Sequence, residues 1–422
     1  MKLSSSLLKE HFRLAVVGGG TGGSAVAARF SRSLPAGQVA VIDGDPRHHY
    51  QPGWTLLGGG LIPAASVMRT KRSLLPKNVK LFEREVGEFQ PANNSLLLND
   101  GTEIGYDFLV IATGMQVEGL EEALASDGTG VCSIYRFDLA QRTYLELEKF
   151  KGGTAVFTFP VPPIKCPGAP QKICYLYIAD EIFRRNGVRE RSHLIFNNTL
   201  GVIFEVEKYA RALTRVLEER GIEFNSRESL IKVDAKKRVA TFQIVDANKQ
   251  PTDQFKEVQY DLLHVAPPCT PVESLRKAAK SGVKLTDAAG WVKVDEKTLK
   301  STEHANVFAL GDCANTTNKK TAAAVAAQLR TLDENLAAAI AGRPSKAVEY
   351  TGYASCPLIV DSKHFNHEGP LETLPIDQSK PRRLYFWITR YFLLWVYWQL
   401  HVKGRWLGPA TWRKILHLGR TQ

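Results

Sequence analysis

Short apolar runs alternate with small-residue and polar segments along the first part of the chain. Residues 12–17, 38–42 and 108–111 are such runs, rich in aliphatic side chains and of the length of a fully buried strand. Residues 24–30, between the first two runs, are small and apolar and favour a helix. Strand, helix and strand in this order are typical of a parallel sheet covered by helices. The pattern therefore predicts an α/β fold.

The turn after the first predicted strand is rich in glycine. It reads Gly18-Gly19-Gly20-Thr21-Gly22-Gly23 and opens the helix. Gly18 permits a tight turn, Gly20 lets the backbone approach a pyrophosphate, and Gly23 lets the helix pack closely on the strand. Asp43, which follows the second predicted strand, is placed to accept hydrogen bonds from ribose hydroxyls. Together these features predict a dinucleotide site at the start of the helix.

Two later strand ends indicate which dinucleotide is bound. Residues 108–111 lead into Ala112-Thr113-Gly114, and residues 306–310 lead into Gly311-Asp312-Cys313. This pairing resembles the strand-end motifs of the flavoprotein disulfide reductase superfamily, in which the aspartate at the position of Asp312 holds the ribityl chain of FAD. We therefore expect FAD as the cofactor, bound by two segments that are far apart in the sequence.

A helix of small residues is predicted soon after Asp312. It begins Lys320-Thr321-Ala322-Ala323-Ala324-Val325. The unpaired N–H groups and the dipole at a helix start stabilise nearby negative charge, which suits the N1–C2=O edge of a reduced flavin. In the superfamily a helix at this place faces the isoalloxazine ring. The alternative is that the alanines only pack the helix against a sheet.

A second dinucleotide fold is expected between the two flavin segments, but without its nucleotide site. Residues 153–159 are its expected first strand, and residues 205–220 and 221–225 are a further helix and strand. The turn at residues 160–170 contains five prolines instead of glycines. Prolines stiffen a turn and remove N–H donors, so they obstruct a pyrophosphate cradle. The sequence therefore argues against a pyridine-nucleotide reductase.

Six cysteines are too few for a disulfide scaffold in a chain of this length, and none of them form a C-x-x-C metal or thioredoxin pair. Cys166 lies in the proline-rich turn, beside Lys165 and before a helix predicted at residues 171–184. A neighbouring cation and a helix start lower the pKa of a thiol and make it reactive. Cys174 and Cys132 are expected to be buried and inert.

The positive charge of the chain is concentrated at its end. The 422 residues carry a formal charge of +12, and residues 381–422 contain eight of the cations, no acidic residue and five of the seven tryptophans. Residues 384–400 are apolar and aromatic but short for a membrane span and interrupted by Arg390, and residues 406–418 form a second such stretch. We expect two helices at a membrane surface. A helical pair that closes a dimer is the alternative, and nucleic acid is not an expected partner.

Four segments together carry a resemblance to one family. They are K-C-P-G-A-P-Q-K at 165–172, G-D-C with K-T-A-A-A-V-A-A-Q, Y-A-S-C-P-L at 353–358 and Y-Q-P-G-W at 50–54. They resemble the sulfide:quinone oxidoreductases, closely the mitochondrial-type branch, from Phe12 to the C-terminus. The resemblance implies that Cys166 and Cys356 are the redox-active pair. It places flavin contacts at Thr21, Gly22, Asp43, Gln51, Val86, Asp312 and the helix start 322–325.

The expected architecture has two Rossmann-like dinucleotide-binding domains and C-terminal membrane-associated helices. Its segments are 12–115 and 291–345 for FAD, 116–290 for the second domain without a nucleotide site, and 346–422 for the region with Cys356 and the membrane helices. Loss of 384–422 is expected to leave the flavin site intact, because this segment carries none of the flavin motifs.

The resemblance implies an enzyme that oxidises hydrogen sulfide through a cysteine persulfide and FAD. It implies that the enzyme reduces ubiquinone and passes the sulfur to an acceptor such as glutathione. The expected location is the mitochondrial inner membrane, or the plasma membrane of a bacterium, and secretion is not expected. The alternatives are an alternative NADH:quinone dehydrogenase and a redox-inert membrane scaffold.

Overall fold

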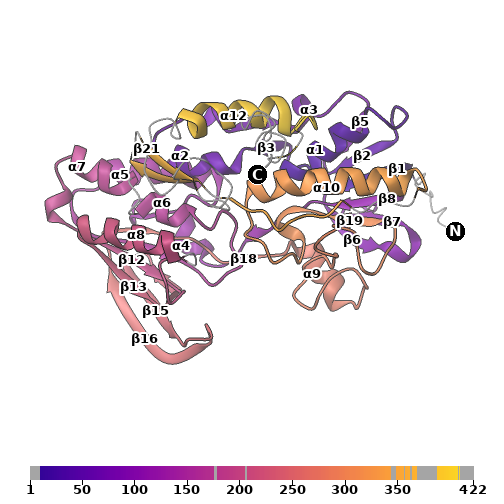
Figure 1. Cartoon of the computed structure of the whole chain (residues 1–422). Helices are drawn as coiled ribbons and strands as arrows, with labels where there is room; N and C mark the ends of the chain where they lie inside the picture. The colour runs from indigo at the N-terminus through magenta and orange to yellow at the C-terminus, as the bar shows by residue number, and fades with distance from the viewer. Residues whose placement is uncertain are drawn as a thin grey trace.

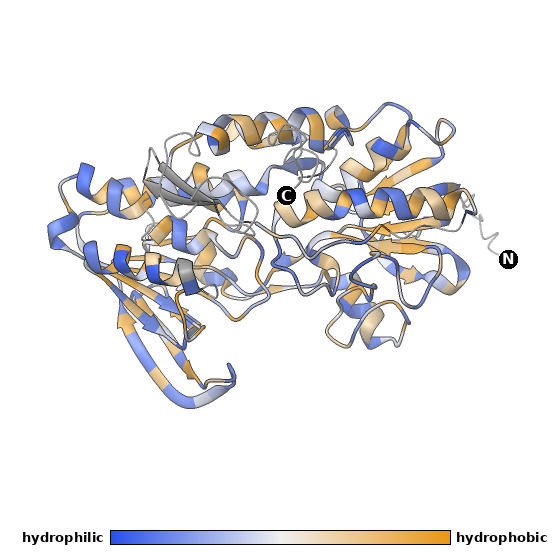
Figure 2. Ribbon diagram, in the orientation of Figure 1, coloured by the Kyte–Doolittle hydropathy of each residue, from blue (hydrophilic) through white to orange (hydrophobic). Residues whose placement is uncertain are grey.

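The computed structural model describes residues 10–174, 178–204, 207–343, 348–355, 357–361, 364–367, 387–406 and 408 (Figure 1). Within these ranges the chain forms two separate sheets built around parallel strands, as predicted for an α/β fold. Figure 2 shows that apolar residues concentrate in the strands of both sheets. This is the expected pattern for parallel strands that are covered on both faces.

The first sheet is assembled from segments at both ends of the chain. Its order is β5-β2-β1-β8-β7-β6, and β19 pairs in parallel with β8 through Leu109 and Val307. Leu14 and Val16 of β1 face one core, whereas Ala15 and Val17 face another, so the strand is buried on both sides. The strands are β1 (Glu10–Val17), β2 (Val39–Ile42), β5 (Val79–Phe82), β6 (Val86–Gln90), β7 (Ser95–Leu98), β8 (Glu103–Ile111) and β19 (Val307–Ala309).

Helices cover both faces of this sheet. α1 (Thr21–Phe30) and α10 (Ala322–Ile340) pack on one face through Val26, Leu332 and Leu336, and α9 (Glu273–Lys280) packs on the other through Leu275. The helix predicted at 24–30 thus begins three residues earlier. Glycines disfavour a helix interior, but Gly23 packs closely on β1 and Gly22 on Leu310 in this first turn.

The second sheet is parallel and contiguous in sequence, with the order β10-β17-β11-β12-β13. One of its faces is covered by the antiparallel meander β14-β15-β16, which contributes Ala240 and Phe242 to a shared core. The expected dinucleotide-type sheet is therefore present. Its strands are β10 (Val131–Cys132), β11 (Gly153–Phe159), β12 (Ser192–Asn198), β13 (Ile222–Ser226) and β17 (Leu262–His264), and the meander is β14 (Glu228–Asp234), β15 (Val239–Val245) and β16 (Pro251–Gln259).

Two helical segments cover the region 171–184, where one helix is predicted. They are α6 (Ala169–Cys174) and α7 (Ile178–Arg185), and residues 175–177 between them lie outside the described part. Further helices are α2 (Trp54–Gly58), α3 (Lys71–Leu74), α4 (Glu121–Ala125), α5 (Phe137–Lys149) and α8 (Glu207–Glu219), and further strands are β3 (Arg47–His49), β4 (Met68–Thr70), β9 (Gln116–Val117), β18 (Cys269–Thr270), β20 (Pro357–Asp361) and β21 (His364–His367).

The C-terminal helical segment, yellow in Figure 1, lies along the outside of the molecule. It consists of α12 (Leu393–Val396) between two π-helical turns, Ile388–Phe392 and Tyr397–His401. Every helix within the described ranges is too short or too polar to traverse a lipid bilayer. The second helix expected at 406–418 lies almost wholly outside the described residues.

Candidate active site

The glycine loop after β1 has the geometry that a pyrophosphate cradle needs. Gly18 has a φ of +96°, and a Cβ on it would overlap the carbonyl group of Ala112. A Cβ on Gly23 would overlap the carbonyl oxygen of Gly18, whereas a Cβ on Gly20 would meet nothing within 4 Å. Gly18 and Gly23 therefore serve close packing, and Gly20 borders open space that a phosphate can occupy.

Asp43 lies at the carboxyl end of β2 beside this loop. Its carboxylate accepts hydrogen bonds from the N–H of Gly19 at 2.6 Å and of Asp45 at 3.0 Å, and pairs with Lys71 at 2.8 Å. Lys71 is buried at the start of α3 and was not identified from the sequence. The ion pair with Lys71 holds the Asp43 side chain at the position expected for a ribose contact.

The second flavin segment brings Asp312 to the amino end of α10. Gly311-Asp312-Cys313 is a short 3₁₀ turn after β19, and the N–H of Gly311 donates to Gln328 of α10 at 2.8 Å. Thr321 caps α10 by accepting from the N–H of Ala324 at 3.1 Å. Burial raises the pKa of Asp312, and the cations of Lys320 and Lys165 oppose this shift.

The other expected flavin residues lie on these same elements or close to them. Thr113 and Gly114 follow β8, and Gly114 has a φ of +69°. Val86 is buried in the same core cluster as Ile42 of β2, and Gln51, which is exposed, begins the 3₁₀ turn before α2. Lys320 is buried and donates to the carbonyl oxygens of Ala314 and Thr316. The open space at Gly20, the Asp43 position and the capped start of α10 fit FAD.

Cys166 lies against the start of the same helix. Its N–H donates to the carbonyl oxygen of Lys320 at 3.0 Å, and its own carbonyl oxygen accepts from Ala169 at 2.9 Å. Its φ is +48°, in the left-handed region that residues other than glycine rarely adopt and that is enriched at functional sites. The loop after β11 of the second sheet therefore brings a cysteine to the start of α10, which covers the first sheet.

Four other described cysteines are buried, and burial raises the pKa of each thiol. The pKa of Cys132 rises to about 12, that of Cys174 rises well above its usual value, and those of Cys269 and Cys313 also rise. The expectation that Cys132 and Cys174 are buried is confirmed. Cys356, the expected partner of Cys166, lies outside the described residues.

An aromatic and basic wall surrounds the Cys166 loop. The ammonium group of Lys165 is buried 5.3 Å from the centre of the Trp54 ring, and Tyr50 contacts Tyr397 with ring centres 4.5 Å apart. Burial raises the pKa of Tyr50, so its hydroxyl stays protonated. The motif at 50–54 thus joins the cysteine loop to the C-terminal helix.

The C-terminal helix also contacts the glycine loop, which the sequence analysis did not foresee. The hydroxyl of Tyr397 lies 2.9 Å from Oγ1 of Thr21 and 2.7 Å from Nε2 of His48. The expectation that loss of 384–422 leaves the flavin site intact did not include these contacts and stays a prediction. A tyrosine and a histidine four residues apart, Tyr397 and His401, interrupt the apolar run and are the signal that could have indicated a buried polar face.

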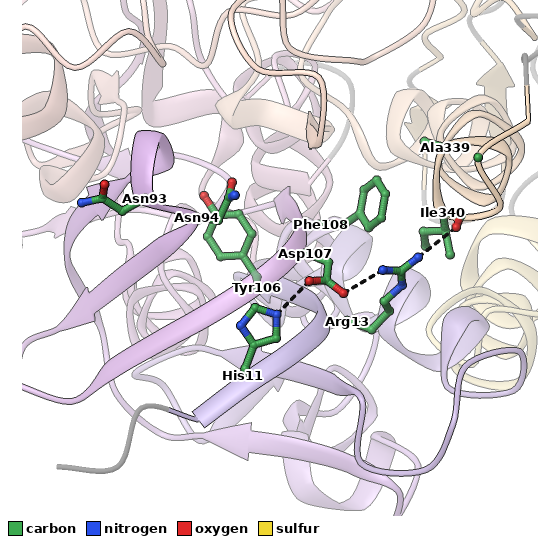
Figure 3. A pocket seen from close by; sticks show the side chains of 10 residues that line it. His11, Arg13, Asn93, Asn94, Tyr106, Asp107, Phe108, Ala339 and Ile340 are labelled. Atoms are coloured by element: carbon green, nitrogen blue, oxygen red, sulfur yellow. Dashed lines mark hydrogen bonds and ion pairs between the residues drawn. The ribbon is translucent and has the colours of Figure 1, made fainter. Parts of the chain in front are cut away.

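A pocket of about 530 Å³ lies away from these residues (Figure 3). Its wall includes His11 and Arg13, which both pair with Asp107 at 2.8 Å. Arg13 also donates to the carbonyl oxygen of Ile340 at the end of α10. The pocket therefore lies toward the amino ends of β1 and β8 and the carboxyl end of α10, whereas the glycine loop and Cys166 lie at the opposite ends.

The chain belongs to the pyridine nucleotide-disulphide oxidoreductase family, whose model matches residues 12–146 and 198–329. This class is FAD-dependent, in agreement with the cradle described above. Within it the chain belongs to the sulfide:quinone oxidoreductase family. The mitochondrial sulfide:quinone oxidoreductase of Mus musculus is 39% identical over 97% of this chain and 91% of that protein. The gap in the class match, residues 147–197, contains the proline turn and Cys166.

Two solved structures are similar in fold. The sulfide:quinone oxidoreductase of Aquifex aeolicus has a TM-score of 0.74 and 18% identity, covering 97% of this chain and 95% of that one. NDH2 of Plasmodium falciparum in complex with NADH has a TM-score of 0.64 and 13% identity, covering 98% and 99%. Since both enzymes share the fold, the fold alone does not separate the two activities.

Proposed function

We propose that the protein is an FAD enzyme that oxidises hydrogen sulfide and reduces ubiquinone. The observation that carries the proposal is the hydrogen bond from the N–H of Cys166 to the carbonyl oxygen of Lys320. It holds a candidate redox thiol at the start of the helix that the superfamily turns toward the flavin. The alternative NADH:quinone dehydrogenase is not favoured, because family membership and the proline turn both oppose it.

The thiol chemistry follows from the pair Cys166 and Cys356. Hydrosulfide attacks the sulfur of Cys356 in the oxidised pair, so the disulfide breaks, a new S–S bond holds the sulfide sulfur on Cys356, and Cys166 leaves as a thiolate. An external thiolate such as glutathione then removes the added sulfur. Oxidation of the two thiols back to the disulfide releases two electrons, for which FAD, when bound, supplies the acceptor on the way to the quinone.

The surroundings of Cys166 suit this chemistry. Lys165 places a buried positive charge next to the cysteine, which favours the thiolate and attracts an anionic substrate. Thr321 and the following N–H groups of α10 present the positive end of a helix dipole to the same space. The buried side chains of Tyr50 and Trp54 limit the access of water.

The turn after β11 supports the absence of a nicotinamide site from the segment 116–290. It carries Pro160, Pro162, Pro163, Pro167 and Pro170, which offer no N–H donors to a pyrophosphate. The divisions at 12–115, 116–290, 291–345 and 346–422 are part of the proposal. The strands β10 to β17 fall within the second segment and β19 falls within the third, whereas α9 of the second segment packs on the first sheet.

The C-terminal helix is proposed as the membrane and quinone end of the enzyme. Four of its aromatic side chains, Trp387, Tyr391, Phe392 and Trp395, are between 43% and 61% exposed, whereas Val396, Tyr397 and Trp398 are buried. An exposed row of aromatic residues beside cations suits the lipid headgroup region. We propose a peripheral or monotopic location at the mitochondrial inner membrane, with the quinone tail entering between these aromatics.

Anaerobic reduction tests the function directly. Sulfide added to the FAD-loaded protein should bleach the flavin absorbance, and a ubiquinone analogue should restore it. Glutathione should increase the number of turnovers as the sulfur acceptor. Bleaching by NADH but not by sulfide would overturn the proposal. Flotation with vesicles that resemble the inner membrane tests the location, and exchange of Trp387 and Trp395 for alanine should weaken it.

A further inference from the structure

A buried hydrogen-bond chain connects the C-terminal helix to the glycine loop. The carbonyl oxygen of Gly19 lies 3.0 Å from Nδ1 of His48 and accepts from the hydroxyl of Ser24 at 2.8 Å. Nε2 of His48 lies 2.7 Å from the hydroxyl of Tyr397, which lies 2.9 Å from that of Thr21. Polar groups of the tail and of the cofactor loop therefore share one network.

The direction of each hydrogen bond follows from the chemistry of the groups. Burial lowers the pKa of His48 to about 4, so the ring is neutral and carries one proton. A carbonyl oxygen can only accept, so the proton lies on Nδ1 and is donated to Gly19. Nε2 must then accept from Tyr397, whose oxygen in turn accepts from Thr21. Tyr397 thereby fixes the tautomer and the orientation of His48.

The orientation of the Gly19 carbonyl matters for an anion. The C=O of Gly19 and the N–H of Gly20 belong to one planar trans peptide and point in opposite directions. Two donors, from His48 and Ser24, hold the carbonyl oxygen. The N–H of Gly20 is thus held pointing away from them, and a Cβ on Gly20 would meet nothing within 4 Å.

The helix that carries Tyr397 is fixed by contacts of the next residue and of a glycine past the end of the helix. The indole N–H of Trp398 donates to the carbonyl oxygen of Ser66 at 2.9 Å, and Arg69 stacks over the same ring. Past the helix, Gly404 has a φ of +60° and packs against Ala25 and Arg29 of α1. Tyr397 is therefore held in place by packing that does not involve the cofactor.

We propose that Tyr397 is a positioning residue for FAD, which acts through His48 to hold the glycine loop ready for the pyrophosphate. The C-terminal helix is then part of the cofactor site as well as the candidate membrane contact. Because the coupling is reciprocal, FAD that binds better to the docked state also strengthens docking of the helix. This inference depends on FAD binding and holds whatever the reducing substrate is.

Titration of the full-length apoprotein with FAD, followed by flavin fluorescence, tests the role of Tyr397. Tyr397→Phe keeps the ring and removes the hydroxyl, which leaves Nε2 of His48 buried without a donor. We expect FAD to bind about 3- to 10-fold more weakly, the cost of one net hydrogen bond. Tyr391→Phe, an exposed tyrosine of the same helix, is the matched control and should leave the affinity unchanged. Equal affinities for wild type and Tyr397→Phe would overturn the proposal.

A double-mutant cycle separates action through His48 from general packing. In His48→Asn the side-chain amide can still donate to Gly19, but it offers nothing in place of Nε2. Addition of Tyr397→Phe to this variant should then weaken FAD binding no further. Additive losses would show that Tyr397 acts by another route and would overturn the assignment.

Limited trypsin cleavage tests the reciprocal effect without a loss of fold. FAD should slow cleavage after Arg405 in the wild-type protein, and Tyr397→Phe should reduce this protection by the same factor by which it weakens FAD binding. Cleavage in wild type that is indifferent to FAD would contradict the coupling.

Discussion

The loops that follow β1 and β11 occupy equivalent places, each at the carboxyl end of a strand that lies between two parallel neighbours, and they have opposite chemistry. The loop after β1 is built of glycines, and Gly20 leaves open space beside the backbone. The loop after β11 is rich in proline and contains Cys166, whose N–H donates a hydrogen bond to the carbonyl oxygen of Lys320. One strand end can therefore accept a pyrophosphate, and the other brings Cys166 to the start of α10. The comparison teaches that two sheets can share a strand arrangement while the loops at equivalent strand ends differ in chemistry.

The strongest test of the comparison is removal of the thiol. Cys166→Ser and Cys356→Ser should each lower sulfide-driven quinone reduction by about 1000-fold or more, because the thiolate is the nucleophile. Both variants should keep FAD, measured as flavin absorbance per protein, since the glycine loop is unchanged. Cys174→Ser, a change at a buried cysteine, is the control and should retain activity. Turnover near that of wild type in either variant would refute the pair.

The proline loop should also exclude NADH. We expect NADH to bleach the flavin at least about 100-fold more slowly than sulfide in stopped-flow absorbance, because the turn cannot supply N–H donors to a pyrophosphate. Rapid bleaching by NADH would show that another surface of the second sheet binds the nucleotide.

Alanine substitutions in the glycine loop separate ligand binding from folding. Gly20→Ala should weaken FAD binding by about 10-fold while the melting temperature of the apoprotein changes little, since its Cβ would crowd only the phosphate. Gly23→Ala should weaken binding and also lower the melting temperature, because its Cβ would overlap the carbonyl oxygen of Gly18. If both substitutions lowered the melting temperature of the apoprotein equally, Gly20 would not be specific to phosphate binding and the prediction would be wrong.

As the pH is lowered, the region around the glycine loop should unfold first and the second sheet later. Burial lowers the pKa of His48 and of His401 to about 4, and that of His264, beside β11, to about 3. A histidine with a lowered folded pKa binds its proton more readily when unfolded, so stability falls as the pH drops from about 6.5 towards 4. Protonation of each histidine lowers the free energy of unfolding by roughly 2–3 kcal/mol across that pH range.

The measurement is FAD release and tryptophan fluorescence between pH 7 and pH 4. Two of the three histidines lie around Tyr397, so FAD should leave before the second sheet unfolds. Asp333 has the opposite slope, because burial raises its pKa to about 7 and its contribution falls as the pH rises through about 4 to 7. Asp333→Asn should therefore steepen the acid transition. A single unfolding transition, with FAD retained until unfolding is complete, would contradict the expectation that FAD leaves before the second sheet unfolds.

Most of the fold and part of the candidate site could be predicted from short local patterns in the sequence. Three features could be predicted because each depends on residues that are neighbours in sequence. They are the packing roles of the glycines, the strand ends at Thr113 and Asp312, and the proline turn. The contact of Cys166 with Lys320 and that of Tyr397 with His48 depend on docking between remote segments. Lys71 was missed for the same reason, since nothing around it in the sequence marks a buried cation.

The pairing of β8 with β19 has a consequence for how the chain reaches its folded state. All strands of the second sheet lie between residues 131 and 264, so this unit can form from one continuous stretch. The first sheet keeps an open edge at β8 until residues 307–309 arrive, and its cofactor loop lacks Tyr397 until still later. Contacts of such large sequence separation form slowly and leave apolar edges exposed in the interval. Newly made protein should therefore depend on chaperones until the last residues are in place and should take up FAD only then.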